Sequence, residues 1–177
     1  MLRNVKLVLV GLAGLFVIFT LIGLLMPSSV KISRGVIVDV QSTYVNNVIG
    51  DIKTWSEWMV WMRAEEGSLV TSILEPDITA VRWRSVNKKE AGQITLLSSR
   101  DQLISLRHNF PALNPSDGAI RIRQINANQT EVLWMLEYPL KWYPWERFEG
   151  IFMDAIIGRS LEASLQLLSD KLRDMNI

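Results

Sequence analysis

The sequence predicts an α+β fold: a curved antiparallel sheet of seven strands, covered by a long C-terminal helix and preceded by one transmembrane helix. Three observations lead to this prediction. Residues 7–26 are uninterruptedly apolar, several segments between residues 30 and 138 alternate apolar and polar side chains, and apolar residues recur every three or four positions from Pro144 onward. Alternation is typical of half-buried antiparallel strands, whereas a spacing of three and four is typical of an amphipathic helix.

Composition excludes several classes of protein. The chain has 177 residues, 49% of them hydrophobic and 21% charged, which fits one folded domain with an appendage and excludes a disordered protein. It has no Cys and one His, which excludes a disulfide framework, a thiolate zinc site and a cluster of histidines. A net charge of +1 gives no reason to expect a nucleic-acid partner. The sequence has no phosphate loop or metal-ligand spacing, so we expect no metal and no cofactor.

The first element is the apolar segment at residues 7–26, in which only Gly11, Gly14, Thr20 and Gly23 are not strongly apolar. As a helix of about 20 residues it spans roughly 30 Å, the thickness of a bilayer core. A buried core helix would carry a polar stripe, which this segment lacks. A cleaved signal peptide fits the basic start, but the apolar stretch is long and no cleavage site of the A-x-A kind follows it. We therefore expect an uncleaved membrane anchor.

Charges flanking this segment predict its orientation. Arg3 and Lys6 precede it closely, whereas Lys31 and Arg34 lie farther beyond its other end. The positive-inside rule then places residues 1–6 in the cytoplasm as a short tail. Residues 27–30 form a short linker, and a periplasmic or otherwise extracytoplasmic domain follows at residues 30–177.

The remaining elements follow in order. A strand is expected at residues 30–40, a helix from Ser42 to about Gly50, and a second short helix within residues 51–62. Six more strands are expected at residues 68–74, 78–86, 92–99, 103–110, 119–125 and 131–138. The last helix begins near Pro144 and runs for roughly 28 residues.

A sheet with one apolar face needs a cover, and only the terminal helix is long enough to supply it. A helix laid across a curved sheet often leaves a cavity, which is the default hypothesis for a ligand site. Strand parity and helix periodicity predict that this cavity is lined by Ile94, Leu96, Leu106, His108, Ile122, Trp134, Phe152 and Ile156.

His108 is the candidate for chemistry. It shares parity with Ile104, Leu106 and Phe110, so it points toward the covered face, where an imidazole can orient a polar ligand group or act as a base. The alternative is a structural histidine, and the sequence identifies no carboxylate that would orient it.

Other polar and aromatic residues have two interpretations each. Trp55, Trp58 and Trp61 form an aromatic platform or pack the short helices onto the sheet. Arg107, Arg121 and Arg123 form a basic stripe for anionic lipid or a solvated face paired with acids. Gly158 permits a close approach or leaves space above the sheet. The adjacent Glu65 and Glu66 are assigned no chemistry.

Three motifs carry a resemblance to a known family. They are Asp51-x-x-x-Trp55-x-x-Trp58-x-x-Trp61, the segment Phe152-Met153-Asp154-Ala155-Ile156-Ile157-Gly158 followed by Glu162 and Leu165, and Leu25-Met26-Pro27-Ser28 after the apolar helix. Over about residues 30–174 the chain resembles the START-like, SRPBCC superfamily, within it the polyketide cyclase/dehydrase-like group, and departs from that group's pattern at Ser160, Leu161 and Ser164. The resemblance implies the helix-grip fold.

This superfamily includes both carriers and enzymes, so the resemblance leaves the function open. We expect a membrane-anchored, single-pass domain that binds a small apolar or amphipathic, lipid-like ligand between sheet and helix. The alternatives are a cyclase or dehydrase that uses His108 as base, and a non-catalytic interaction module tethered to the membrane.

Overall fold

The computed structural model describes residues 2–63, 69–84, 91–111 and 113–175. The helices are α1 (Leu2–Leu25), α2 (Ser42–Gly50), the 3₁₀ helix η1 (Ile52–Thr54), α3 (Trp55–Trp58), α4 (Val60–Arg63) and α5 (Pro144–Asp174). The strands are β1 (Ser29–Val38), β2 (Leu69–Glu75), β3 (Ile78–Arg84), β4 (Ala91–Arg100), β5 (Leu103–Asn109), β6 (Ser116–Asn126) and β7 (Gln129–Pro139).

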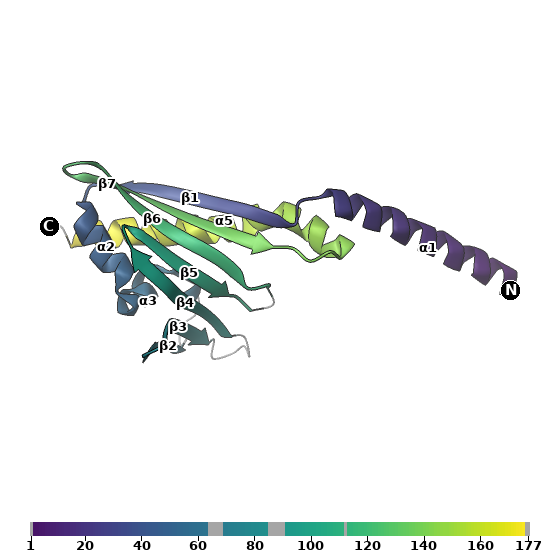
Figure 1. Cartoon of the computed structure of the whole chain (residues 1–177), viewed down its shortest axis with the longest axis horizontal. Coiled ribbons are helices and arrows are strands. Elements are labelled where there is room, and N and C mark those ends of the chain that lie inside the picture. The colour runs from purple at the N-terminus through teal and green to yellow at the C-terminus, as the bar shows by residue number, and fades with distance from the viewer. Residues whose placement is uncertain (1, 64–68, 85–90, 112, 176–177) are drawn as a thin grey trace.

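The seven strands form one antiparallel sheet in the order β1-β7-β6-β5-β4-β3-β2. Only β1 is out of chain order, because α2, η1, α3 and α4 separate it from β2 and it pairs with β7 instead. The short helices lie at one end of the sheet, and α5 runs along it beside β1 (Figure 1). The predicted fold class is confirmed, including the long terminal helix.

Most strand boundaries lie within two residues of the prediction, and the start of β6 differs by more. Strand β6 begins at Ser116, three residues before the expected start at residue 119. Pro115, Asp117 and Gly118 make this stretch resemble a loop, yet Asp117 and Gly118 pair in register with both β5 and β7. Pairing on both sides outweighs the low strand propensity of Asp and Gly.

The core lies between the covered face of the sheet and the helices. On the sheet it is formed by alternate residues of neighbouring strands, such as Ile104 and Leu106 of β5 and Ile120 and Ile122 of β6. Helix α5 contributes one buried stripe: Met153, Ile157, Leu161, Leu165, Leu168 and Leu172. A period of two on the strands and of three or four on the helix is what places these side chains on facing surfaces.

An arginine joins β1 to α5 within this layer. Arg34 lies on the covered face of β1, and its guanidinium donates to the carboxylates of Asp154 at 2.9 Å and Glu162 at 2.5 Å. A Cβ on Gly158 would lie 2.3 Å from Nη2 of Arg34, so the glycine leaves the space that the guanidinium occupies. Hydrogen bonding to Arg34 holds the pKa of Asp154 below its usual value.

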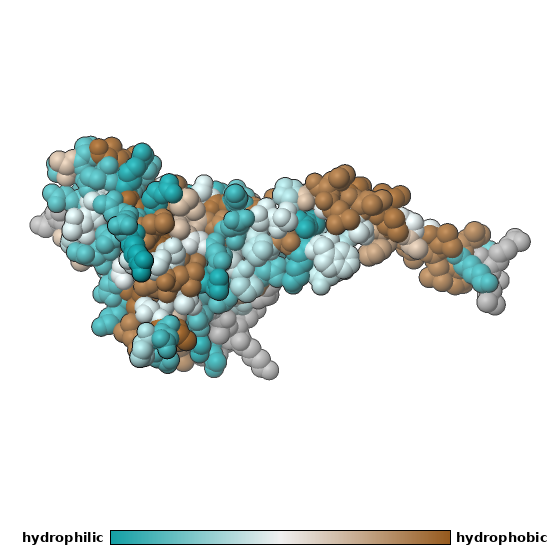
Figure 2. Space-filling view, viewed as in Figure 1, coloured by the Kyte–Doolittle hydropathy of each residue, from teal (hydrophilic) through white to brown (hydrophobic). Residues whose placement is uncertain are grey.

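Helix α1 projects away from the domain (Figure 1) and has an almost continuous apolar surface (Figure 2). Its segment Asn4–Leu25 is long and apolar enough to cross a membrane, and 6% of its most apolar window is buried. This length and exposure are those of a membrane anchor or of a signal segment, and exclude a core helix of the folded domain.

Candidate functional site

His108 lies in the centre of the covered face, and its side chain is completely buried. Gly118 of β6 makes room for it, because a Cβ at that position would lie 2.9 Å from Cε1 of the imidazole and 2.8 Å from the carbonyl oxygen of Met135. The imidazole therefore lies close to the backbone of the neighbouring strand at Gly118, where a larger residue would displace it.

Aromatic rings surround this imidazole. Its centroid lies 5.6 Å from Phe110 and 5.9 Å from Trp134. Trp61 contacts both of these rings, at 4.8 Å from Phe110 and 5.6 Å from Trp134, and Trp58 packs edge-on against Trp134 at 5.7 Å. We call Trp58, Trp61, Phe110 and Trp134 the aromatic wall. Trp55 and Trp58 are fully buried and Trp61 is half-buried, which agrees with packing of the short helices onto the sheet.

Four polar atoms inside this region have no hydrogen-bond partner at ordinary distance and angle among the described residues: Nδ1 and Nε2 of His108, Oγ of Ser116 and Nε1 of Trp134. The Ser116 backbone lies close enough to the imidazole to interact with it weakly. Ser116 faces His108 across the β5–β6 pair, and Trp134 lies beside it. Buried polar groups are nearly always paired, because each unpaired one costs about 1–3 kcal/mol. Such a group of donors and acceptors is typical of a site that a polar ligand group or ordered water completes.

Burial decides the protonation state of this site. Desolvation lowers the pKa of His108 to about 4, against smaller opposing effects of the Ser116 backbone and the Asp117 carboxylate. At neutral pH the imidazole is uncharged and offers one donor and one acceptor. A base whose conjugate acid has so low a pKa is weak, and Asp117 is engaged on the outer face by Arg107 at 2.7 Å.

Six of the eight residues that were predicted to line a cavity lie on the covered face of the sheet. Ile94, Leu106, His108, Ile122 and Trp134 are buried on the covered face, and Leu96 of β4 is half-buried there.

Phe152 and Ile156 were placed wrongly by this prediction. They are 62% and 51% exposed on α5, whereas its sheet-facing stripe passes through Met153 and Ile157. Both stripes obey helical spacing, so periodicity alone could not tell which of them faces the sheet.

The outer face of the sheet carries the arginines. Arg107 pairs with Asp117, and Arg123 pairs with Glu131 at 2.8 Å, as expected of a solvated face. Glu65 and Glu66 lie outside the described residues.

Sequence reasoning missed Ser116, which it assigned to a loop. One signal was available: Ser116, Gly118, Ile120 and Ile122 alternate in one parity, and Ile122 had already been placed on the covered face.

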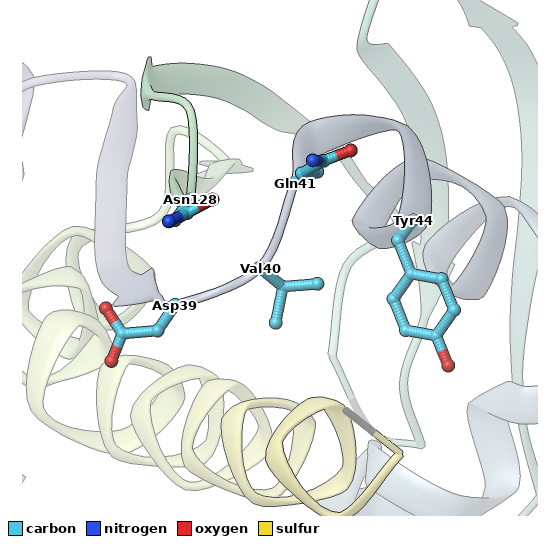
Figure 3. A pocket seen from close by; sticks show the side chains of 5 residues that line it. All are labelled: Asp39, Val40, Gln41, Tyr44 and Asn128. Carbon is cyan, nitrogen blue, oxygen red and sulfur yellow. The ribbon is translucent and has the colours of Figure 1, made fainter. Parts of the chain in front are cut away.

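A separate polar hollow opens where β1 leads into α2. It is lined by Asp39, Val40, Gln41, Tyr44 and Asn128, with Asp39 and Asn128 on one side and Tyr44 on the other (Figure 3). Nε2 of Gln129 donates to Asp39 at 2.8 Å, which ties the β6–β7 turn to this edge. The hollow is open, and none of its five described lining residues has a buried polar atom without a partner, unlike the surroundings of His108.

Solved structures resemble this fold at low sequence identity. The Zhui aromatase/cyclase from Streptomyces sp. R1128 matches with a TM-score of 0.61 and 15% identity, over 81% of this chain and 93% of that one. A START superfamily protein from Mycobacterium smegmatis matches with a TM-score of 0.60 and 12% identity, over 82% and 98%. CalU16 from Micromonospora echinospora matches with a TM-score of 0.54 and 12% identity, over 81% and 74%.

The chain has the START-like helix-grip fold. No family model matches its sequence, and no curated protein is significantly similar to it. At these identities the helix-grip likeness establishes the architecture, which is shared by carriers and enzymes alike, and the site must decide between them.

Proposed function

We propose that this chain is a membrane-anchored helix-grip domain that binds a small apolar or amphipathic molecule beside His108. The observation that carries the proposal is the group of four unpartnered polar atoms enclosed by the aromatic wall. A ligand with an apolar, preferably planar body would pack against these rings, and a hydroxyl or carbonyl on it would pair with the indole N–H of Trp134 and the neutral imidazole.

The chemistry of the site favours binding over catalysis. Proton abstraction at neutral pH needs a base with a pKa near 7, and burial moves the pKa of His108 to about 4. No carboxylate or tyrosine within the described residues makes a hydrogen bond to the imidazole. The uncharged ring is instead suited to orienting a ligand through one donor and one acceptor.

For anchoring and orientation we propose that α1 spans the membrane with Arg3 and Lys6 in the cytoplasm. Arg34, beyond the other end, is already paired with Asp154 and Glu162. In the sequence, Lys31 is the first basic residue after α1 and lies farther from the apolar segment than Lys6 does, so the flanking charges favour the N-terminal side as the cytoplasmic one.

The single histidine makes ligand binding directly measurable. Full-length protein labelled with ¹⁵N in its imidazole and held in lipid nanodiscs is titrated with 1-naphthol, a planar apolar probe with one hydroxyl. We expect a saturable shift of the His108 resonances and an affinity about tenfold lower in Trp134→Phe or Ser116→Ala, since each loses one hydrogen-bonding group.

Ser105→Ala, on the outer face of the same strand as His108, is the matched control and should leave the affinity unchanged. If the resonances do not shift with 1-naphthol and mass spectrometry finds no molecule co-purified with the protein, the binding proposal is wrong. The interaction-module alternative would then stand, with the aromatic wall as ordinary core.

A further inference from the structure

The first half of α5 has a second stripe that is apolar apart from the exposed Glu149 and that no part of the described chain covers. Trp145, Phe152 and Ile156 are 61%, 62% and 51% exposed, and Ile151 beside them is 60% exposed. The second half of the helix is ordinary, with polar residues such as Glu162, Gln166 and Arg173 on its exposed side. A helix that is apolar on both sides over only part of its length requires a partner for that part.

Aromatic side chains gather just before this stripe. The Trp142 and Tyr143 rings lie 4.9 Å apart, Tyr143 stacks on Trp145 at 5.1 Å, and Nζ of Lys141 lies 6.0 Å from the Tyr143 centroid. We call Trp142, Tyr143 and Trp145 the aromatic corner. Tryptophan and tyrosine beside a lysine are the residues that concentrate at the boundary between lipid and water.

The first turns of α5, which follow the aromatic corner in the chain, lie against the apolar helix α1. A Cβ on Gly23 would lie 3.3 Å from Cα of Pro144, and the Phe19 and Phe148 rings meet edge-on at 5.8 Å. Nη1 of Arg147 donates to the carbonyl oxygen of Met26 at 3.4 Å and also to that of Pro27. The start of α5 is therefore level with the last turn of α1, at the point where the chain leaves the apolar span.

An apolar groove runs between the two helices. It is lined on one side by Leu12, Leu15, Phe16 and Phe19 of α1, and on the other by Pro144, Trp145 and Phe148 of α5. The α1 residues in it belong to the segment that is long enough to cross a bilayer. A groove of this kind, open and without charged side chains, suits a lipid acyl chain.

We propose that the aromatic corner and the exposed stripe of α5 form a second membrane contact, inserted into the leaflet from which α1 emerges. This inference rests on the proposed anchoring by α1. The packing of Phe148 on Phe19 and the hydrogen bonds of Arg147 already join α5 to α1, and a lipid contact farther along α5 would hold the domain against the bilayer in one orientation. Phe152 is seven residues beyond Trp145, roughly 10 Å farther along the helix, so insertion becomes shallower from Trp145 toward Ile156.

Because the chain contains no cysteine, single spin labels can test this arrangement in the full-length protein. Cysteine is introduced separately at Leu15, Trp145, Phe152 and Ala163, all exposed, and the labelled proteins are placed in phosphatidylcholine vesicles. Accessibility is measured to oxygen, which partitions into lipid, and to a nickel chelate, which remains in water. We expect lipid-like values at Leu15 and Trp145, intermediate values at Phe152 and aqueous values at Ala163.

The outcomes separate this inference from the anchoring on which it rests. An aqueous value at Leu15 overturns the anchor itself. A lipid-like value at Leu15 with aqueous values at Trp145 and Phe152 leaves the anchor intact and overturns the second contact. Low accessibility to both reagents at Phe152 also overturns it, because a second copy or another protein would then cover the stripe.

Discussion

His108 is the residue whose environment departs most from its ordinary one. Its strand parity correctly placed it on the covered face, because side chains alternate strictly along a strand. The depth of its burial depends on residues far away in the chain, such as Trp61, Gly118 and Trp134. No local pattern around residue 108 contains that information.

The lowered pKa makes a prediction about stability. The folded imidazole has a pKa of about 4, against 6.5 for the free side chain. Between these two pH values the imidazole is mostly protonated in the unfolded chain and mostly neutral in the folded one, so lowering the pH favours unfolding. The free energy of unfolding should therefore fall by about 3 kcal/mol as the pH drops from 6.5 to 4 on account of this residue. Urea unfolding of the wild type and of His108→Gln, followed by circular dichroism at both pH values, measures this difference.

Ser116→Ala is the control for this measurement, since a hydroxyl does not titrate in this range and its effect on stability should be the same at both pH values. A difference between wild type and His108→Gln that does not change with pH would contradict burial of an uncharged imidazole.

Among the elements, α5 shows that the spacing of apolar residues predicts a helix but not always which of its sides faces the core. Its start at Pro144 and its amphipathic spacing were predicted correctly, and it extends to Asp174. Phe152 and Ile156 were assigned to the wrong side, because both apolar stripes of the first half satisfy the same spacing. The choice between them is made by the strand beneath, where Gly150 approaches Val30 and Gly158 accommodates Arg34.

The contact of Arg34 with Gly158 predicts that Gly158→Ala destabilises the wild type but stabilises a variant that lacks the arginine. Gly158→Ala places a Cβ where the Arg34 guanidinium lies and displaces it from Asp154 and Glu162, so we expect a loss of about 1 kcal/mol. In an Arg34→Ala background the space is free and the same substitution should stabilise the helix by about 0.5–1 kcal/mol. Denaturant unfolding of the four proteins of this double-mutant cycle measures the coupling. Equal effects of Gly158→Ala in both backgrounds would show that the glycine and the arginine are not coupled.

At the scale of the whole molecule, α1 and the domain are two parts with different surfaces. The exposed apolar residues of α1 form an almost continuous surface outside the folded core (Figure 2), whereas the domain buries most of its large apolar side chains between sheet and helices. The proposed anchoring would place each surface in a matching environment, with lipid around α1 and water around the polar outer face of the domain.

An uncleaved anchor predicts that the protein recovered from membranes retains its N-terminus. Intact-mass spectrometry of the full-length protein should give the mass of the whole chain, less at most the initiator methionine. A mass lower by the whole of α1 would identify the segment as a cleaved signal peptide and would also remove the α1–α5 groove.

The sequence by itself determined the order and type of the elements, the apolar helix and the face of each strand, because these follow from short-range periodicity. The tertiary structure decided which of the two stripes on α5 faces the sheet, that Gly158 and Gly118 make room for Arg34 and His108, and that Ser116 and Trp134 lie beside the imidazole. These facts depend on contacts between residues distant in the chain, and the pairing of β1 with β7 and the packing of α5 on β1 bring those residues together.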